Sequence, residues 1–81
     1  MKGVVRNINS ERGVLAIETD EGYSLCELLS DNMALIGDVV ECECHPLGTA
    51  RVVNHSTGQT LRVYFQDHRA TEERALDFVG P

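Results

Sequence analysis

The side chains best suited to binding a metal are concentrated in the run 42–45 (Cys-Glu-Cys-His), and a further thiol stands at Cys26. Thiolates and imidazoles are zinc ligands, but zinc motifs usually separate paired ligands by about two to four residues across a turn. Cys42 and Cys44 instead lie within a stretch typical of a strand, where they share one face with Val40. Since free cysteine behaves as a small hydrophobe, we predict core thiols, with no metal and no cofactor.

Catalytic motifs are not recognisable in the sequence. His45, His55 and His68 are scattered, and none stands beside a Ser or Cys in a nucleophile motif, so we expect surface histidines. There is no Gly-rich phosphate loop and no set resembling a catalytic triad. A chain of 81 residues also buries only a thin core, with little room for a pocket. The sequence therefore predicts that the protein is not an enzyme.

Charge and hydropathy argue against several classes of protein. Seven Lys and Arg against 13 Asp and Glu give a net charge of −6, which argues against a general polyanion binder. The longest apolar runs have four residues, whereas a bilayer requires roughly 20, so no membrane association is expected. Charges at Lys2 and Arg6 do not suit a signal peptide, and an odd number of cysteines does not suit a secreted disulfide scaffold. These features favour a cytoplasmic location.

Short segments rich in β-branched residues alternate with turn signals, which is the pattern of an antiparallel meander. The strands are predicted near residues 3–9, 13–19, 23–28, 39–46, 49–54 and 60–66. The segment 29–36 is too long for a hairpin and predicts a crossover. Residues 71–79 favour a short helix capped by Thr71, which must dock Leu76 and Val79 on the sheet to be stable.

Three meandering strands, a longer crossing and a final hairpin describe a small five-stranded Greek-key barrel of the OB type. The chain resembles the cold-shock domain family over about residues 1–54: in MKGVVRNINSERG at the start, in IETDEG at 17–22, in GDVVECE at 37–43 and in GTARVVN at 48–54. The fold class is thus all-β, with an extension at 55–81 packed on the same domain. The predicted core includes Val5, Ile17, Cys26, Val40 and Cys42.

Cold-shock domains stack bases on aromatic rings of their first three strands, and each stack contributes about 1–3 kcal/mol. Those rings are absent here, where Asn7 and Ile8, the run 13–17 and the run 24–28 replace them. The resemblance implies a weak single-stranded RNA or DNA binder. Its phosphate contacts would be Lys2, Arg6, Arg12 and Arg51, with Asn7 on a base edge or sugar.

The segment 60–66 alternates strongly, with Leu61, Val63 and Phe65 on one face and the polar residues on the other. Its polar face carries Arg62 and Tyr64, which form a local basic-aromatic cluster with His68 and Arg69 and are further candidates for nucleic-acid binding. A solvated strand face explains the same residues.

The aliphatic residues Val14, Leu25 and Leu28 occupy positions that the family barrel turns outward. We expect an exposed patch there, although a core role remains open, and strand 60–66 could cover it. Two functions therefore compete. One is weak nucleic-acid binding, and the other is a protein-interaction or self-assembly module, with a protein partner or a homodimer, on a barrel that has lost nucleic-acid binding.

Overall fold

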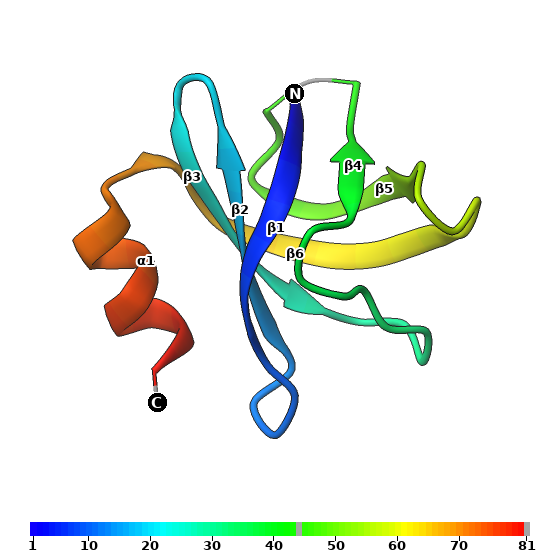
Figure 1. Cartoon of the computed structure of the whole chain (residues 1–81), viewed down its shortest axis with the longest axis horizontal. Coiled ribbons are helices and arrows are strands. Elements are labelled where there is room, and N and C mark those ends of the chain that lie inside the picture. The colour runs from blue at the N-terminus through cyan, green and yellow to red at the C-terminus, as the bar shows by residue number, and fades with distance from the viewer. Residues whose placement is uncertain (44, 81) are drawn as a thin grey trace.

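The structure, a computed structural model, describes residues 1–43 and 45–80. Six antiparallel strands close into a barrel in the order β1-β2-β3-β6-β5-β4, and a short helix follows them (Figure 1). The elements are β1 (Lys2–Asn9), β2 (Val14–Thr19), β3 (Gly22–Leu28), β4 (Val39–Glu41), β5 (Gly48–Asn54), β6 (Thr60–Ala70) and α1 (Glu72–Val79). The prediction of a small all-β barrel with a terminal helix is confirmed. No helix in the described residues is long and apolar enough to cross a membrane.

The barrel interior follows the two-residue alternation of the strands. On β2, Leu15 and Ile17 point inward, while Val14 and Ala16 point to the outer face and join a separate cluster. The interior is completed by residues from all the other strands and from the crossover. Its buried members are Val5, Leu15, Ile17, Cys26, Ala34, Val40, Cys42, Val52, Leu61, Val63 and Phe65. All five residues predicted for the core are among them.

Strand β6 is part of the barrel wall. It pairs with β3 on one side and with β5 on the other, and Leu61, Val63 and Phe65 face the interior. The expectation that this strand could lie over the outer aliphatic positions is therefore wrong. Because β6 lies between β3 and β5, the barrel wall includes residues beyond 54. The strand also continues to Ala70, beyond the predicted end at residue 66.

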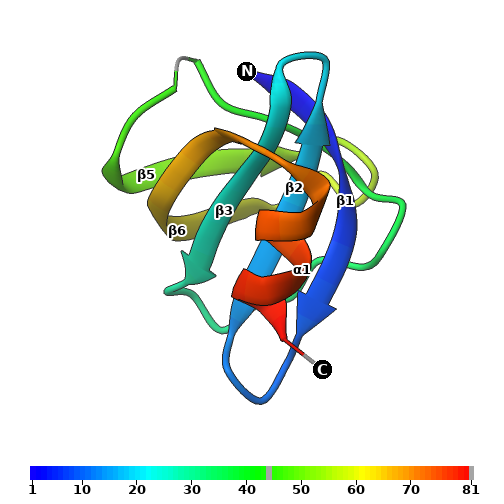
Figure 2. The same ribbon diagram turned by 90° about the vertical axis from the view of Figure 1, so that its left-hand side faces the viewer.

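Helix α1 lies across the outer face of β1, β2 and β3 (Figure 2). It begins after Thr71, as predicted, and the Thr71 hydroxyl accepts a hydrogen bond from the Arg74 N–H at 3.1 Å. The helix buries Ala75 and Val79, whereas Leu76 is 52% exposed. The predicted docking of Leu76 is wrong because successive helical residues are about 100° apart, so Val79, one turn after Ala75, shares its face.

Strand β4 is shorter than the predicted 39–46. Its ladder with β5 contains the pairs Val40–Asn54 and Glu41–Val53, while β5 continues along β6 as far as Gly48. Beyond Glu41 the chain follows β1, since the Cys42 N–H donates to the Met1 carbonyl at 2.8 Å. Strands β4 and β5 therefore diverge, and the barrel wall opens between them.

The crossover before β4 is fixed by a buried carboxylate. Asp38 Oδ2 accepts hydrogen bonds from the Leu35 N–H at 2.9 Å and from Asn54 Nδ2 at 2.8 Å. Asn54 is fully buried, and its Oδ1 accepts from the backbone of Ser56 and Thr57. This network ties the crossover to the β5–β6 hairpin and so positions the end of β5.

Candidate binding surfaces on the barrel

The predicted aliphatic patch lies under α1. Val14 and Leu25 do point away from the barrel interior, but they are only 6% and 0% exposed because they contact the helix. Leu28 is half-buried and packs against the interior cluster instead. The expectation of an exposed patch at these residues is therefore wrong. This face presents no open surface for bases or for a partner while α1 is docked.

Polar groups at the ends of α1 fix it in place. The Val79 carbonyl accepts hydrogen bonds from Asn9 Nδ2 at 2.9 Å and from Arg12 Nη1 at 3.3 Å, which satisfies an orphan carbonyl of the last turn. At the other end, the Tyr23 hydroxyl lies 3.4 Å from Glu72 Oε2, and burial, followed by nearby carboxylates, raises the pKa of Tyr23. Arg12, a predicted phosphate contact, is thus engaged with the helix.

The remaining predicted contacts on β1 do not form a basic surface. Arg6 Nε lies 2.9 Å from Glu18 Oε1, and both side chains are about half exposed. Lys2 is exposed but pairs across the sheet with Glu41, and Asn7 is half-buried. Most of the positive charge predicted for the first strands is therefore opposed by neighbouring carboxylates.

A different set of predicted residues does come together, on the outer face of β5 and β6. Arg51 lies directly opposite Arg62, and Tyr64, which is 44% exposed, lies opposite Thr49. Neither arginine has an acidic group within ion-pair distance among residues 1–43 and 45–80. Like charges directly opposite each other repel, so an anion placed between them would be favoured.

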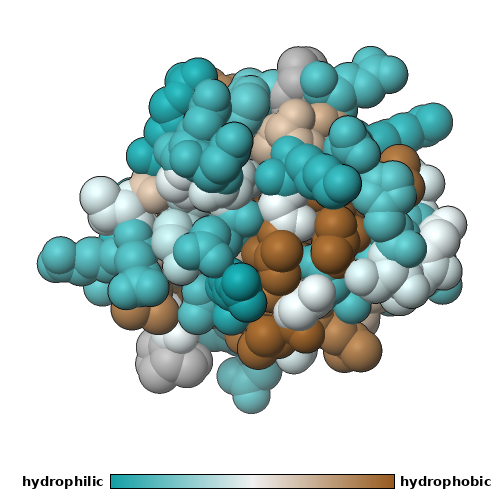
Figure 3. Space-filling model, turned by 45° about the horizontal axis from the view of Figure 1, so that its top comes forward, coloured by the Kyte–Doolittle hydropathy of each residue, from teal (hydrophilic) through white to brown (hydrophobic). Residues whose placement is uncertain are grey.

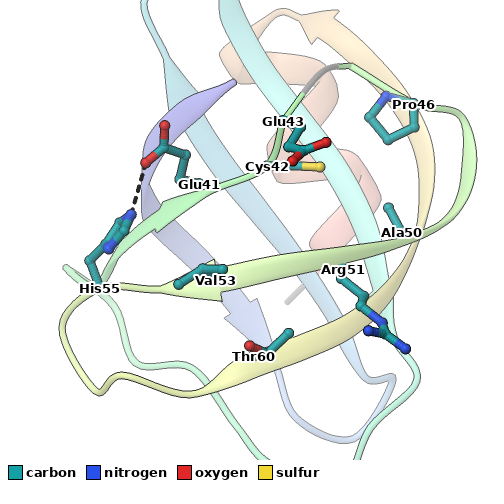
Figure 4. Close-up of a pocket in the computed structure, with 9 residues that line it drawn as sticks. All are labelled: Glu41, Cys42, Glu43, Pro46, Ala50, Arg51, Val53, His55 and Thr60. Carbon is teal, nitrogen blue, oxygen red and sulfur yellow. Dashed lines mark hydrogen bonds and ion pairs between the residues drawn. The ribbon is translucent and has the colours of Figure 1, made fainter.

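Next to this face, the divergence of β4 and β5 leaves an open cavity of about 640 Å³ (Figure 4). It is lined by Glu41, Cys42, Glu43, Pro46, Ala50, Arg51, Val53, His55 and Thr60. The Glu41–His55 pair stands at one end and Pro46 at the other. Figure 3 shows one face of the molecule, on which apolar side chains gather at the surface with hydrophilic ones around them.

The Glu41–His55 contact bounds the cavity electrostatically. His55 Nε2 lies 2.8 Å from Glu41 Oε1, and this hydrogen bond lowers the pKa of Glu41. The Glu41 carboxylate is thus matched with its own partner, whereas Arg51 and Glu43, which also line the cavity, have no ion-pair partner among the described residues. The charged groups around the cavity are therefore of both signs.

The backbone N–H and C=O groups of successive β5 residues point alternately toward β6 and toward β4. The Asn54 N–H donates to the Gln59 carbonyl, on the β6 side, whereas the His55 N–H donates to the Val39 carbonyl, on the β4 side. In an antiparallel ladder this alternation continues, so the backbone groups of Thr49 and Arg51 point toward the β4 side. Since the β4–β5 ladder ends at Val53, no described residue pairs with those groups.

His68 is the site residue that sequence reasoning misplaced. It is half-buried rather than a surface residue: Nε2 donates to the Pro46 carbonyl at 2.7 Å, which leaves Nδ1 to accept from the Ser24 hydroxyl, also at 2.7 Å. Its ring also contacts those of Phe65 and His45. Ser24 is only 1% exposed, so the pair is a structural link that holds Pro46 beside the cavity. Nothing local in the sequence joins positions 24, 46 and 68.

Cysteine chemistry is limited by burial. Cys26 and Cys42 are buried free thiols, and burial raises the pKa of Cys26 to about 12. Within residues 1–43 and 45–80, no group of three or more His, Cys, Asp or Glu side chains is arranged to hold a metal ion. The prediction for Cys44 lies outside the described residues.

Comparison of the chain with protein-family models, with curated proteins and with solved structures finds no match. The function is therefore argued from the surfaces themselves.

Proposed function

We propose that this chain is a protein-interaction module whose binding surface lies along β5. The observation that carries this proposal is the contrast between two sides of the barrel. Helix α1 covers the face of β1, β2 and β3, whereas the β4 side of β5 has an open cavity and a backbone edge without a described partner. Backbone groups left unpaired in this way can pair with another chain, as those of an edge strand do.

The charge balance supports a protein ligand. With a net charge of −6, the surface repels a polyanion at long range, so extended nucleic acid gains little from electrostatic steering. An interface with a protein depends on local shape and local charge instead. A cytoplasmic location is part of the same proposal and is supported by two free buried thiols.

A second candidate is weak binding of single-stranded RNA or DNA, which one specific observation favours. Arg51 and Arg62 have no ion-pair partner in the part of the chain that the structure describes, and they lie near the exposed ring of Tyr64. The outer face of β5 and β6 could therefore offer two phosphate contacts and one stacking platform. The resemblance of residues 1–54 to cold-shock domains supports it further. A single stack of about 1–3 kcal/mol limits its affinity.

The two candidates are separated by a photo-crosslinking amino acid placed at Val53, on the cavity, or at Leu76, on the outer surface of α1. In the native host, the Val53 position should give a defined protein adduct that the Leu76 position does not.

In parallel, oligo-U should bind with a dissociation constant of roughly 100 µM or weaker at 0.15 M salt, and more weakly still as salt rises. Micromolar oligo-U binding that depends on Arg62, or crosslinks only to nucleic acid, would overturn the proposal.

A further inference from the structure

The geometry points to a site for a single nucleotide on the outer face of β5 and β6, with the phosphate between Arg51 and Arg62 and a guanine base stacked on Tyr64. The Arg51 side chain leads away from the opening of the cavity, on the side of β5 away from Glu43 (Figure 4). The site is thus separate from the surface proposed for a protein partner and does not depend on it. It follows from the register of β3, β5 and β6.

The β5–β6 ladder holds the two arginines side by side. Arg51 and Arg62 are direct cross-strand partners, and the bond from the Asn54 N–H to the Gln59 carbonyl fixes the alternation of the ladder. Counted back from there in steps of two, Arg51 and Arg62 form a pair without backbone hydrogen bonds between them. In such pairs the Cα atoms are about 4.5 Å apart and the side chains are closest. The Arg62 N–H accordingly donates to Ser30 Oγ at 3.2 Å instead.

An anion relieves the repulsion between these two charges. Neither arginine forms an ion pair with any residue in 1–43 or 45–80. A phosphate monoester carries about two negative charges and several acceptor oxygens, so both guanidinium groups can donate to it at once. The net charge of −6 is screened beyond about 8 Å at physiological ionic strength, and it therefore opposes a small anion less than a long polyanion.

Tyr64 supplies a ring beside the arginine pair. It follows Arg62 by two residues on the same face of β6, which places it about 7 Å further along the strand. Its side chain is 44% exposed, whereas Tyr23 and Phe65 are buried and Phe78 is half-buried. A base that stacks on such a ring gains affinity whatever its sequence context. One exposed ring and one arginine pair match one nucleotide.

A carboxylate on the far side of the ring selects the base. Glu27, in β3, lies directly opposite Tyr64, is exposed and forms no ion pair with any described residue. An ionised carboxylate can only accept hydrogen bonds. Guanine presents two adjacent N–H donors, which match the two carboxylate oxygens, whereas uracil flanks its single N–H with carbonyls. The site therefore favours a guanine nucleotide over a uracil nucleotide.

The test titrates the full chain with guanosine monophosphate (GMP), uridine monophosphate (UMP) and guanosine at about 0.15 M salt. Backbone and side-chain NMR shifts locate the site, and the titration gives the affinities. We expect GMP to shift the signals of Arg51, Arg62 and Tyr64. It should bind about fivefold or more tighter than UMP, and about tenfold tighter than guanosine, which lacks the phosphate.

Protein variants separate the two contacts. Arg51→Gln and Arg62→Gln should each lower the affinity for GMP about tenfold, and Tyr64→Leu should have an effect of similar size. Arg74→Gln is the matched control, because it removes the same charge from an exposed residue of α1, and its affinity should stay within about twofold. A native-like NMR spectrum confirms that each variant is folded.

Glu27→Gln tests the base contact apart from the charge. Loss of a negative charge near the phosphate should strengthen GMP and UMP alike, so the measured quantity is the ratio of their affinities. This ratio should fall toward one. An unchanged ratio would show that Glu27 does not select the base.

Several outcomes would overturn the inference. These are GMP shifts centred away from Arg62, wild-type GMP affinity in a folded Arg62→Gln, guanosine that binds as tightly as GMP, or no binding up to about 10 mM GMP. Tighter binding of oligo-U than of GMP through the same residues would make this face a strand-binding surface instead. The Val53 crosslink tests the protein partner separately, so failure of the nucleotide site leaves the proposed function standing.

Discussion

The two outer faces of the barrel are built from similar strands, but one is covered by a helix and the other is exposed. On the face of β1, β2 and β3, small and aliphatic side chains point outward and α1 seals them from water. On the face of β5 and β6, Arg51, Arg62 and Tyr64 point outward, and no helix or strand of the described residues lies over them. The C-terminal segment is responsible for both states, since β6 completes the open face and α1 closes the other. The outer face of the first three strands, which the resemblance predicts as the binding surface, is therefore covered in this chain.

The largest difference between the faces should appear on truncation of their side chains. Leu25→Ala removes a fully buried side chain beneath α1 and should lower the free energy of unfolding by about 2–5 kcal/mol. Val53→Ala, at a residue that is 40% exposed beside the cavity, should cost less than about 1 kcal/mol. Urea denaturation of the two variants measures both values. Equal losses would contradict the idea that one face is sealed and the other open.

Adding aromatic rings tests the same difference in the opposite direction. Phe at both Val14 and Leu25 should overpack the sealed face, which costs about 1–3 kcal/mol per site in urea denaturation, and should not improve oligo-U binding. Thr49→Phe places a ring opposite Tyr64 on the open face, where it should leave stability nearly unchanged and strengthen oligo-U binding. Stronger oligo-U binding by the Val14 and Leu25 variant would show that α1 leaves that face readily.

The helix cap controls how firmly the face is sealed. Thr71→Ala removes the side-chain acceptor for the Arg74 N–H and should destabilise the protein by about 1 kcal/mol, while Thr71→Ser keeps the hydroxyl and should have little effect. Amide exchange of α1 should accelerate more than that of the barrel strands in the Ala variant. Uniform acceleration throughout the molecule would mean instead that α1 and the barrel unfold together.

The smallest effect is expected at the open cavity, where Glu41 and His55 are both exposed. The hydrogen bond from His55 lowers the pKa of Glu41, so the stabilisation is present above the ordinary Glu pKa and is lost as pH falls through the lowered value. In His55→Ala, the pKa of Glu41 should return toward its ordinary value, which a carboxyl NMR titration measures. The variant should keep the stability of the wild type at neutral pH to within error. An unchanged Glu41 titration would show that the contact is absent in solution.

Strand alternation allowed much of the fold to be predicted, because each side chain's face depends only on its position along its own strand. Val5, Ile17 and Cys26 were placed in the core in this way. Alternation does not determine which strands lie next to each other in the sheet. Nothing in the alternation of residues 60–66 distinguishes a strand inserted between β3 and β5 from one laid over the outside, because the same apolar face is buried in both cases.

The candidate site was predictable only in part, because its residues act through partners remote in sequence. Arg51, Arg62 and Tyr64 were identified from their residue types, and the β5–β6 ladder brings them together. Arg12 has the same chemistry but bonds a carbonyl 67 positions away. The open edge of β5 depends on where β4 stops, and no residue in the run 42–46 marks that point before Pro46.

The place of β6 in the wall also constrains the order in which the chain can fold. During translation the first five strands emerge while β3 and β5 still lack the element that joins them, so a closed interior cannot form until β6 has left the ribosome. Until then Leu15, Ile17 and Val52 have no Leu61, Val63 or Phe65 to pack against. Contacts between such distant segments close slowly, so the nascent chain should remain open and protease-sensitive at least until β6 (Thr60–Ala70) has been made.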